Sequence, residues 1–151
     1  MSNKSIGVWL IEDNAAFRGS VARAIDRIEG VHCSGSFGAM EEALARLESQ
    51  PQPQAILLDI NLPGMDGIEG LGEIHQRAPE IKVIILTVFD DQDRVFRAIC
   101  AGASGYLLKT APLEKIGEAT HEVIHGGAPI NPRIARRMLD LFARISPPSR
   151  D

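Results

Sequence analysis

The chain has 151 residues, 44% of them hydrophobic and 24% charged, which is typical of one globular domain with a sizeable core. Sixteen basic against twenty acidic residues give a formal net charge of −4, which offers no electrostatic basis for direct binding of nucleic acid. No apolar run approaches the ~20 residues of a membrane helix and no signal-peptide core begins the chain, so we expect a cytoplasmic protein that does not contact a membrane.

Short apolar runs alternate with segments of helical period, the pattern typical of a parallel α/β sheet. Strands are predicted at residues 6–11, 31–37, 55–59, 82–87 and 105–109. Helices are predicted within 17–28, 40–49, 68–79, 91–101, 112–125 and 131–145. Right-handed crossovers then predict a doubly wound, five-stranded parallel sheet in the order 2-1-3-4-5, with an additional C-terminal helix.

The last two helices carry more specific expectations. In the helix that begins near Pro112, the residues expected to face inward are Leu113, Ile116, Val123 and Ile124. Asn131 followed by Pro132 predicts a capped start for the last helix. Its apolar stripe consists of Ile134, Met138, Leu141, Phe142 and Ile145. This stripe either packs on the domain's own surface or serves as a contact for a second copy or another domain, and the sequence leaves both open.

Polar side chains stand where four of the predicted strands end. Asp59 follows the apolar run at residues 55–58 and precedes a Pro-Gly turn. Glu12 and Asp13, Thr87, and Lys109 end three further strands. Because the carboxyl ends of parallel strands form the binding edge of such a sheet, we expect these groups to converge on one site.

The converging groups suit a divalent metal and a phosphoryl group. Asp13 and Asp59 can ligate Mg²⁺ or Mn²⁺, with Glu12 holding a metal-bound water and the Asn61 backbone carbonyl facing the same ion. Asp59 is the natural nucleophile, since a carboxylate can form an aspartyl phosphate. The Lys109 ammonium supplies positive charge and the Thr87 hydroxyl can donate to a phosphoryl oxygen.

With these residues in view, the chain resembles the receiver domain of bacterial two-component response regulators over about residues 5–126. The motifs that carry the resemblance are Glu12-Asp13, Asp59 with the turn at 62–67, Thr87, and the segment 102–109. The resemblance implies a flavodoxin-like (CheY-like) fold and magnesium-dependent transfer of phosphate to Asp59 from a sensor histidine kinase. It also implies slow self-catalysed hydrolysis, tuned at Asn61 and Phe89, in a phosphoacceptor switch that is not a classified enzyme.

The segments 86–91 and 103–106, and Gly126-Gly127 before a last helix, are similar to the NarL/FixJ (LuxR-type) subfamily. This resemblance implies that Thr87 and Tyr106 switch a surface that controls an output domain, with transcription regulation as the outcome. We expect a receiver at residues 1–126 and a linker helix and tail at 127–151, with the DNA-binding effector domain absent from this chain. The Pro-Pro composition at 146–149 favours a truncated regulator over a stand-alone receiver. A homodimer is a further candidate assembly.

Two other hypotheses remain. The chain could act as a scaffold through protein contacts without phosphorylation, but the full set of site residues argues against this. Residues 121–125 match the H-E-x-x-H pattern of zinc proteases, which predicts a small zinc hydrolase using His121, Glu122 and His125. The helix is expected to end directly after His125 and no third ligand follows at a recognised spacing, which argues against this hypothesis.

Overall fold

The computed structural model describes residues 5–49 and 51–145. Strands and helices alternate along the chain until α5, which α6 follows directly. The strands are β1 (Ile6–Ile11), β2 (Val31–Phe37), β3 (Ala55–Leu58), β4 (Lys82–Thr87) and β5 (Gly105–Leu108). The helices are α1 (Ala15–Asp26), α2 (Met40–Leu47), α3 (Gly67–Arg77), α4 (Gln92–Cys100), α5 (Leu113–Ile124) and α6 (Pro132–Arg144).

In the described part of the chain, five strands form one parallel sheet in the order β2-β1-β3-β4-β5. This confirms the predicted order. Neighbouring strands end in register: Ile11 pairs with Leu58, Leu58 with Ile85, and Thr87 with Leu108. The residues that follow these positions therefore meet along one edge of the sheet, which we call the carboxyl rim.

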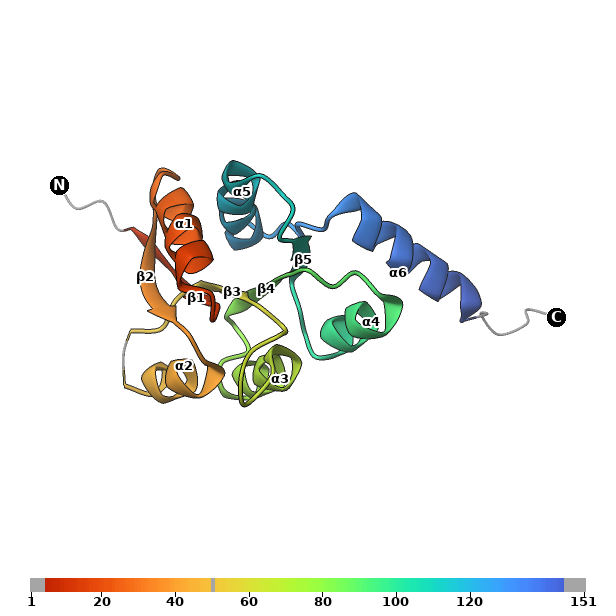
Figure 1. Ribbon diagram of the computed structural model, residues 1–151, viewed down its shortest axis with the longest axis horizontal. Helices are drawn as coiled ribbons and strands as arrows, with labels where there is room; N and C mark the ends of the chain where they lie inside the picture. Colours follow the sequence, from red (N-terminus) through yellow and green to blue (C-terminus); the bar gives the residue numbers. More distant parts are fainter. Residues whose placement is uncertain (1–4, 50, 146–151) are drawn as a thin grey trace.

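Helices cover both faces of the sheet, with α1 and α5 on one side and α2, α3 and α4 on the other (Figure 1). Each face has its own apolar core, because alternate strand residues point to opposite sides. Residues of β3 and β4 are buried throughout except Lys82, as expected for strands covered on both faces. None of the helices in residues 5–49 and 51–145 has the length and hydropathy needed to cross a membrane.

The segment before α6 covers the open edge of β5. The Tyr106 N–H donates to the Pro129 carbonyl at 2.9 Å, and the Asn131 N–H donates to the Tyr106 carbonyl at 3.0 Å. α6 then extends outward from β5 beside α4 (Figure 1). These bonds satisfy backbone groups that an edge strand otherwise leaves exposed.

One expectation for the last helices needs revision, and the question that the sequence left open for the α6 stripe is answered in part. Leu113 was expected to face inward, but its exposed fraction is 37%, because it is the first residue of α5, next to exposed Pro112. In the α6 stripe only Ile134 is fully buried, and Phe142 and Ile145 are 56% and 59% exposed. The stripe therefore packs on the domain at its N-terminal end and leaves its C-terminal end open. The predicted linker at 146–149 lies outside the described residues.

Candidate functional site

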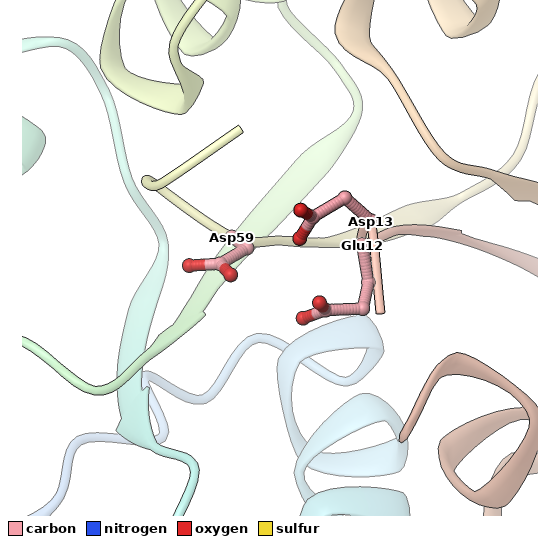
Figure 2. A group of neighbouring side chains, drawn as sticks. All are labelled: Glu12, Asp13 and Asp59. Atoms are coloured by element: carbon pink, nitrogen blue, oxygen red, sulfur yellow. The ribbon is translucent and has the colours of Figure 1, made fainter. Parts of the chain in front are cut away.

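Three carboxylates meet at the carboxyl rim. Among the described residues, oxygen atoms of Glu12, Asp13 and Asp59 all lie within 4.8 Å of one another. Figure 2 shows Glu12 and Asp13 extending from the end of β1 toward Asp59 at the end of β3. Glu12 and Asp59 are buried, with exposed fractions of 1% and 4%, whereas Asp13 is exposed. The group is thus buried at Glu12 and Asp59 and accessible to solvent at Asp13.

The backbone fixes these carboxylates by continuing the sheet past the strand ends. The Glu12 N–H donates to the Phe37 carbonyl at 2.9 Å, and the Asp59 N–H donates to the Ile11 carbonyl at 3.1 Å. Gly67 at the start of α3 packs directly against this point, since a Cβ there would lie 2.1 Å from the Asp59 carbonyl oxygen. The turn after Asp59 therefore requires glycine at its end.

Lys109 lies between the two buried carboxylates. Its Nζ is 2.8 Å from Asp59 Oδ2 and 2.5 Å from Glu12 Oε1. Burial lowers the pKa of Lys109, but hydrogen bonds to Asp59 and Glu12 outweigh it and hold the pKa above its usual value. For Glu12, burial has the opposite effect: it raises the pKa of the carboxyl above its usual value, although the hydrogen bond with Lys109 acts to lower it. The ammonium is thus locked in its charged form beside Asp59.

Thr87 ends β4 with a fully buried side chain whose hydroxyl finds no hydrogen-bond partner among the described residues. Its carbonyl accepts the Lys109 N–H at 2.8 Å, so the two residues lie side by side at the rim. A buried hydroxyl without a partner costs about 1–3 kcal/mol relative to a satisfied one. Such a group is suited to bind an acceptor that arrives from outside the chain.

Tyr106 lies on β5 in the core layer shared with α4. Its side chain is fully buried, and its hydroxyl donates to the Phe89 carbonyl at 2.8 Å. Burial raises the pKa of Tyr106 well above its usual range, with a further contribution from the negative charge of Asp91. The Phe89 ring, half-buried, lies under the Arg94 guanidinium at 4.0 Å. Tyr106 therefore joins β5 to the loop that follows Thr87.

Asn61 is exposed in the turn after Asp59, and its backbone N–H donates to Asp59 Oδ1 at 3.2 Å. Two contacts brace this turn. Asp66 caps α3 by accepting the Glu69 N–H, and Glu41 of α2 accepts the Met65 N–H at 2.9 Å. The turn is thus held from both flanking helices, which keeps Asn61 beside the carboxylate.

Three supporting residues were not predicted from the sequence. Asn14 caps α1 through Phe17 N–H and also donates its own N–H to Glu12 Oε2 at 2.8 Å. Arg18 donates to the Glu12 carbonyl, and the Phe17 ring lies 5.0 Å from Lys109 Nζ. Asn before a helical pattern is a readable cap signal. Nothing in the sequence indicates that Arg18 or Phe17 reaches the rim.

The donor set fits a divalent cation. Three carboxylates and one ammonium carry a net charge near −2 when ionised, and a hard cation favours such oxygen ligands. The exposed side of Asp13 leaves this charge open to an approaching ion. The arrangement can thus hold a divalent metal beside a nucleophilic carboxylate, a fixed ammonium and an unpaired hydroxyl.

The H-E-x-x-H residues lie elsewhere, on the outer face of α5. His121, Glu122 and His125 are all exposed, and the two imidazole rings lie 4.2 Å apart. His125 Nδ1 is 2.8 Å from the His121 carbonyl oxygen, so one ring nitrogen is already used within the helix. Within the described residues these side chains belong to no group of three metal-binding side chains. The geometry does not favour the zinc hydrolase hypothesis.

Comparisons with known proteins agree with this geometry. Residues 8–121 match the family described as the response regulator receiver domain. The transcriptional regulatory protein DegU of Brevibacillus brevis is 33% identical over 96% of this chain and 61% of its own length. Response regulator GacA of Pseudomonas aeruginosa is 32% identical over 88% of this chain and 62% of its own length. The chain thus spans less than two thirds of these relatives.

Solved structures show the same architecture. A LuxR-family two-component response regulator from Aurantimonas sp. SI85-9A1 superposes with a TM-score of 0.84 at 25% identity, covering 94% of this chain and 99% of that one. The receiver domain of the putative response regulator NarL from Mycobacterium tuberculosis gives 0.76 at 27% identity, covering 82% and 98%. These likenesses extend through most of the described residues.

Proposed function

The chain belongs to the response regulator receiver family, in its NarL/FixJ-like group, and from this premise we propose that Asp59 accepts a phosphoryl group from the phosphohistidine of a sensor kinase. One observation carries the proposal: the buried Asp59 carboxylate lies beside Lys109 and two further carboxylates at the rim. This arrangement unites nucleophile, positive charge and a metal-binding donor set in one place.

In the proposed transfer, an Asp59 carboxylate oxygen attacks phosphorus, a P–O bond forms, and the P–N bond to the kinase imidazole breaks. Lys109 already contacts Asp59 Oδ2 and can follow the charge onto the phosphoryl oxygens. Thr87 offers its unpaired hydroxyl as a donor to the same oxygens. Hydrolysis by water later regenerates Asp59, and we propose that Asn61, whose N–H donates to Asp59 Oδ1, and Phe89 tune the rate of this step.

We propose Mg²⁺ or Mn²⁺ as the cofactor, held by Asp13, Asp59 and the Asn61 carbonyl, with Glu12 acting through a bound water. Bound there, the ion supplies positive charge that neutralises the transferred group. The close approach of Glu12, Asp13 and Asp59 supports this assignment. The ion pair between Glu12 and Lys109 supports the less direct role that we propose for Glu12.

For the output, we propose that the switch centred on Thr87 and Tyr106 controls a transcription-regulating domain. The curated relatives named above are longer than this chain, and one is named a transcriptional regulatory protein. The receiver then occupies residues 1–126, with 127–151 as linker helix and tail. Because Ile134 of α6 is fully buried in the receiver core, this linker helix begins as part of the receiver's own packing.

The test uses acetyl phosphate as phosphodonor with Mg²⁺ and intact-mass spectrometry as readout. The wild-type chain should gain the mass of one phosphoryl group, and chelation of the metal should prevent the gain. Asp59→Asn should show no adduct, whereas Asp66→Asn, in the same turn but serving as the α3 cap, should label normally. An equal adduct in Asp59→Asn would exclude Asp59 as the phosphoacceptor.

A further inference from the structure

α6 is joined to the β4–α4 loop (residues 88–91) through Asp90. Arg137 Nε donates to the Asp90 carbonyl at 3.0 Å. The Asp90 carboxylate oxygen Oδ2 lies 3.4 Å from Arg133 Nε and 3.7 Å from Arg137 Nη2. We call these contacts of Asp90 with Arg133 and Arg137 the clamp. The clamp joins residues more than forty positions apart in sequence, and none of them belongs to the rim site.

The same loop is held from its other side by the core. Phe89, next to Asp90, accepts the Tyr106 hydroxyl at 2.8 Å, and the loop follows directly on Thr87. The Tyr106 backbone in turn pairs with Pro129 and Asn131, which lead into α6. The β4–α4 loop and the start of α6 are therefore connected twice, through Tyr106 and through the clamp.

Beyond its first turns α6 is weakly packed. Ile134 is fully buried and Met138 is half-buried against the same core. Further along, α6 and α4 leave between them a cleft of ≈ 100 Å³ lined by apolar side chains and Cys100. Phe142 on its α6 side is 56% exposed. The clamp residues Arg133 and Arg137 lie on either side of Ile134, so the clamp and this one buried side chain together hold the first two turns of α6, and the turns beyond Met138 depend on them for their place beside α4.

We propose that the clamp reports the phosphorylation state of Asp59 to α6, and that phosphorylation releases α6 from α4. The inference rests on the proposed function of Asp59. A phosphoryl group at Asp59 adds negative charge and acceptor oxygens at the rim, where Lys109 contacts Asp59 and its backbone N–H bonds Thr87, whose hydroxyl has no partner among the described residues. When Thr87 moves toward this acceptor, the following loop moves with it and draws Asp90 away from Arg133 and Arg137. Ile134 keeps the first turn of α6 packed, so the turns beyond Met138 are the part that is released from α4.

Linkage makes the coupling reciprocal. If phosphorylation weakens the docking of α6, then loss of the clamp favours the phosphorylated state by the same factor. The contacts are partly exposed, with side-chain exposed fractions of 31% for Asp90 and 41% for Arg137. Ion pairs of this kind shift an equilibrium by roughly two- to fivefold. A graded bias of the position of α6, rather than an all-or-none release, is therefore the expected behaviour.

The test measures backbone amide exchange of the α6 peptide by mass spectrometry, with and without excess acetyl phosphate and Mg²⁺. Intact mass on the same samples reports the adduct at Asp59. In the wild type, phosphorylation should speed α6 exchange roughly two- to fivefold. In Asp90→Asn and Arg137→Gln, exchange should already be faster without phosphorylation and should rise less on phosphorylation. Unchanged exchange in β1 and α1 separates local release from global destabilisation.

Arg136→Gln is the matched control, because Arg136 lies on the same helix and pairs only at 3.6 Å with Asp140. It removes the same charge without touching the loop and should behave as the wild type. A full adduct with unchanged α6 exchange would overturn the coupling and leave the proposed function intact. Clamp variants that match Arg136→Gln would overturn it equally. Absence of the adduct in the wild type would overturn both proposals.

Discussion

The carboxyl rim and helix α5 contain similar residue types but use them differently. At the rim, Thr87 keeps a buried hydroxyl that has no partner within the described part of the chain, and two buried carboxylates contact the Lys109 ammonium. In α5, the buried Thr120 hydroxyl donates to the Gly117 carbonyl at 2.6 Å, and His125 Nδ1 lies within hydrogen-bond distance of the His121 carbonyl. The rim therefore keeps polar groups that can still bind a ligand, whereas the corresponding groups of α5 already form hydrogen bonds within the helix. Residue type alone does not mark a functional site, whereas unsatisfied buried polar groups do.

Removal of Lys109 should break the rim most severely. Lys109→Ala leaves Glu12 and Asp59 buried without their positive partner, so the free energy of unfolding should fall by about 3 kcal/mol. Added Mg²⁺ should restore part of this loss, because the carboxylates that would bind it remain. Denaturant unfolding followed by the fluorescence of Trp9, the single tryptophan, measures both effects.

Lys115→Ala provides the α5 counterpart, because Lys115 pairs on the exposed surface with Glu118 at 3.7 Å. Its unfolding free energy should change by no more than about 0.5 kcal/mol.

Lys109→Ala should also bind metal and accept phosphate while failing to transmit the change to α6. Equal stabilities of the two lysine variants would show that the rim charges are not coupled as the distances indicate.

Tyr106 should make the rim sensitive to alkaline pH. Its pKa is raised by burial, so the folded state favours the neutral phenol. This contribution to stability is fully present below the unfolded pKa of about 10 and is lost as the pH rises above it. Lys109, whose pKa is also raised, loses its contribution over the same alkaline range. Stability should therefore decline from about pH 10 upward.

Because Tyr106 is the only tyrosine of the chain, ultraviolet absorbance of tyrosinate reports it directly. The absorbance should appear only together with unfolding. Tyr106→Phe should lose the bond to the Phe89 carbonyl, lower stability by about 1–2 kcal/mol, and flatten the alkaline decline. Free titration of tyrosinate near pH 10 in the folded protein would contradict the buried, hydrogen-bonded state.

The two buried threonines give a direct test of the comparison. Thr87→Val removes a hydroxyl that has no partner in residues 5–49 and 51–145, so it should leave stability unchanged or raise it by up to about 1 kcal/mol. Thr120→Val removes a satisfied hydroxyl and should lower stability by about 1 kcal/mol. The effects on phosphorylation should be the opposite of the effects on stability. Thr87→Val should lose the faster amide exchange of α6 on phosphorylation, and Thr120→Val should keep it. Equal stability changes would remove the distinction between the rim and α5.

Most of the fold was predictable because buried strands leave a clear apolar pattern. The bounds of β1, β2 and β4 agree with the prediction to the residue. The convergence of Asp13, Asp59, Thr87 and Lys109 followed from topology alone, since parallel strands bring their carboxyl ends together. What the sequence could not show depends on side-chain distances. The ion pair of Lys109 with Glu12 is of this kind, and so is the lack of a partner for the Thr87 hydroxyl among the residues that the structure describes.

The α6 region was the least predictable part. Asp90, Arg133 and Arg137 are far apart in sequence and carry no motif, so only the folded arrangement reveals their contact. The apolar stripe left open whether it packs on the domain or serves as a contact, and it did not show how far along α6 the packing extends. Leu113 shows the same limit at the start of α5, where helical period predicts burial for a residue that the fold leaves exposed. Helical periodicity identifies the apolar face of a helix, but it does not show where along the helix the packing on that face ends.

The smallest effect is expected from the histidine pair of α5. His121→Ala combined with His125→Ala removes two exposed side chains, so the free energy of unfolding should change by no more than about 0.5 kcal/mol, with a small loss from His125 near the helix C-terminus. The adduct yield with acetyl phosphate should be unchanged, since neither residue is part of the rim group. In calorimetric titration with zinc, the wild type and the double variant should behave alike, because we expect no equimolar zinc site at these two histidines. Equimolar zinc binding by the wild type that is lost in the double variant would instead mean that two histidines on one exposed helix turn suffice for a site. The contrast between satisfied and unsatisfied polar groups would then fail to separate structural from functional positions in this chain.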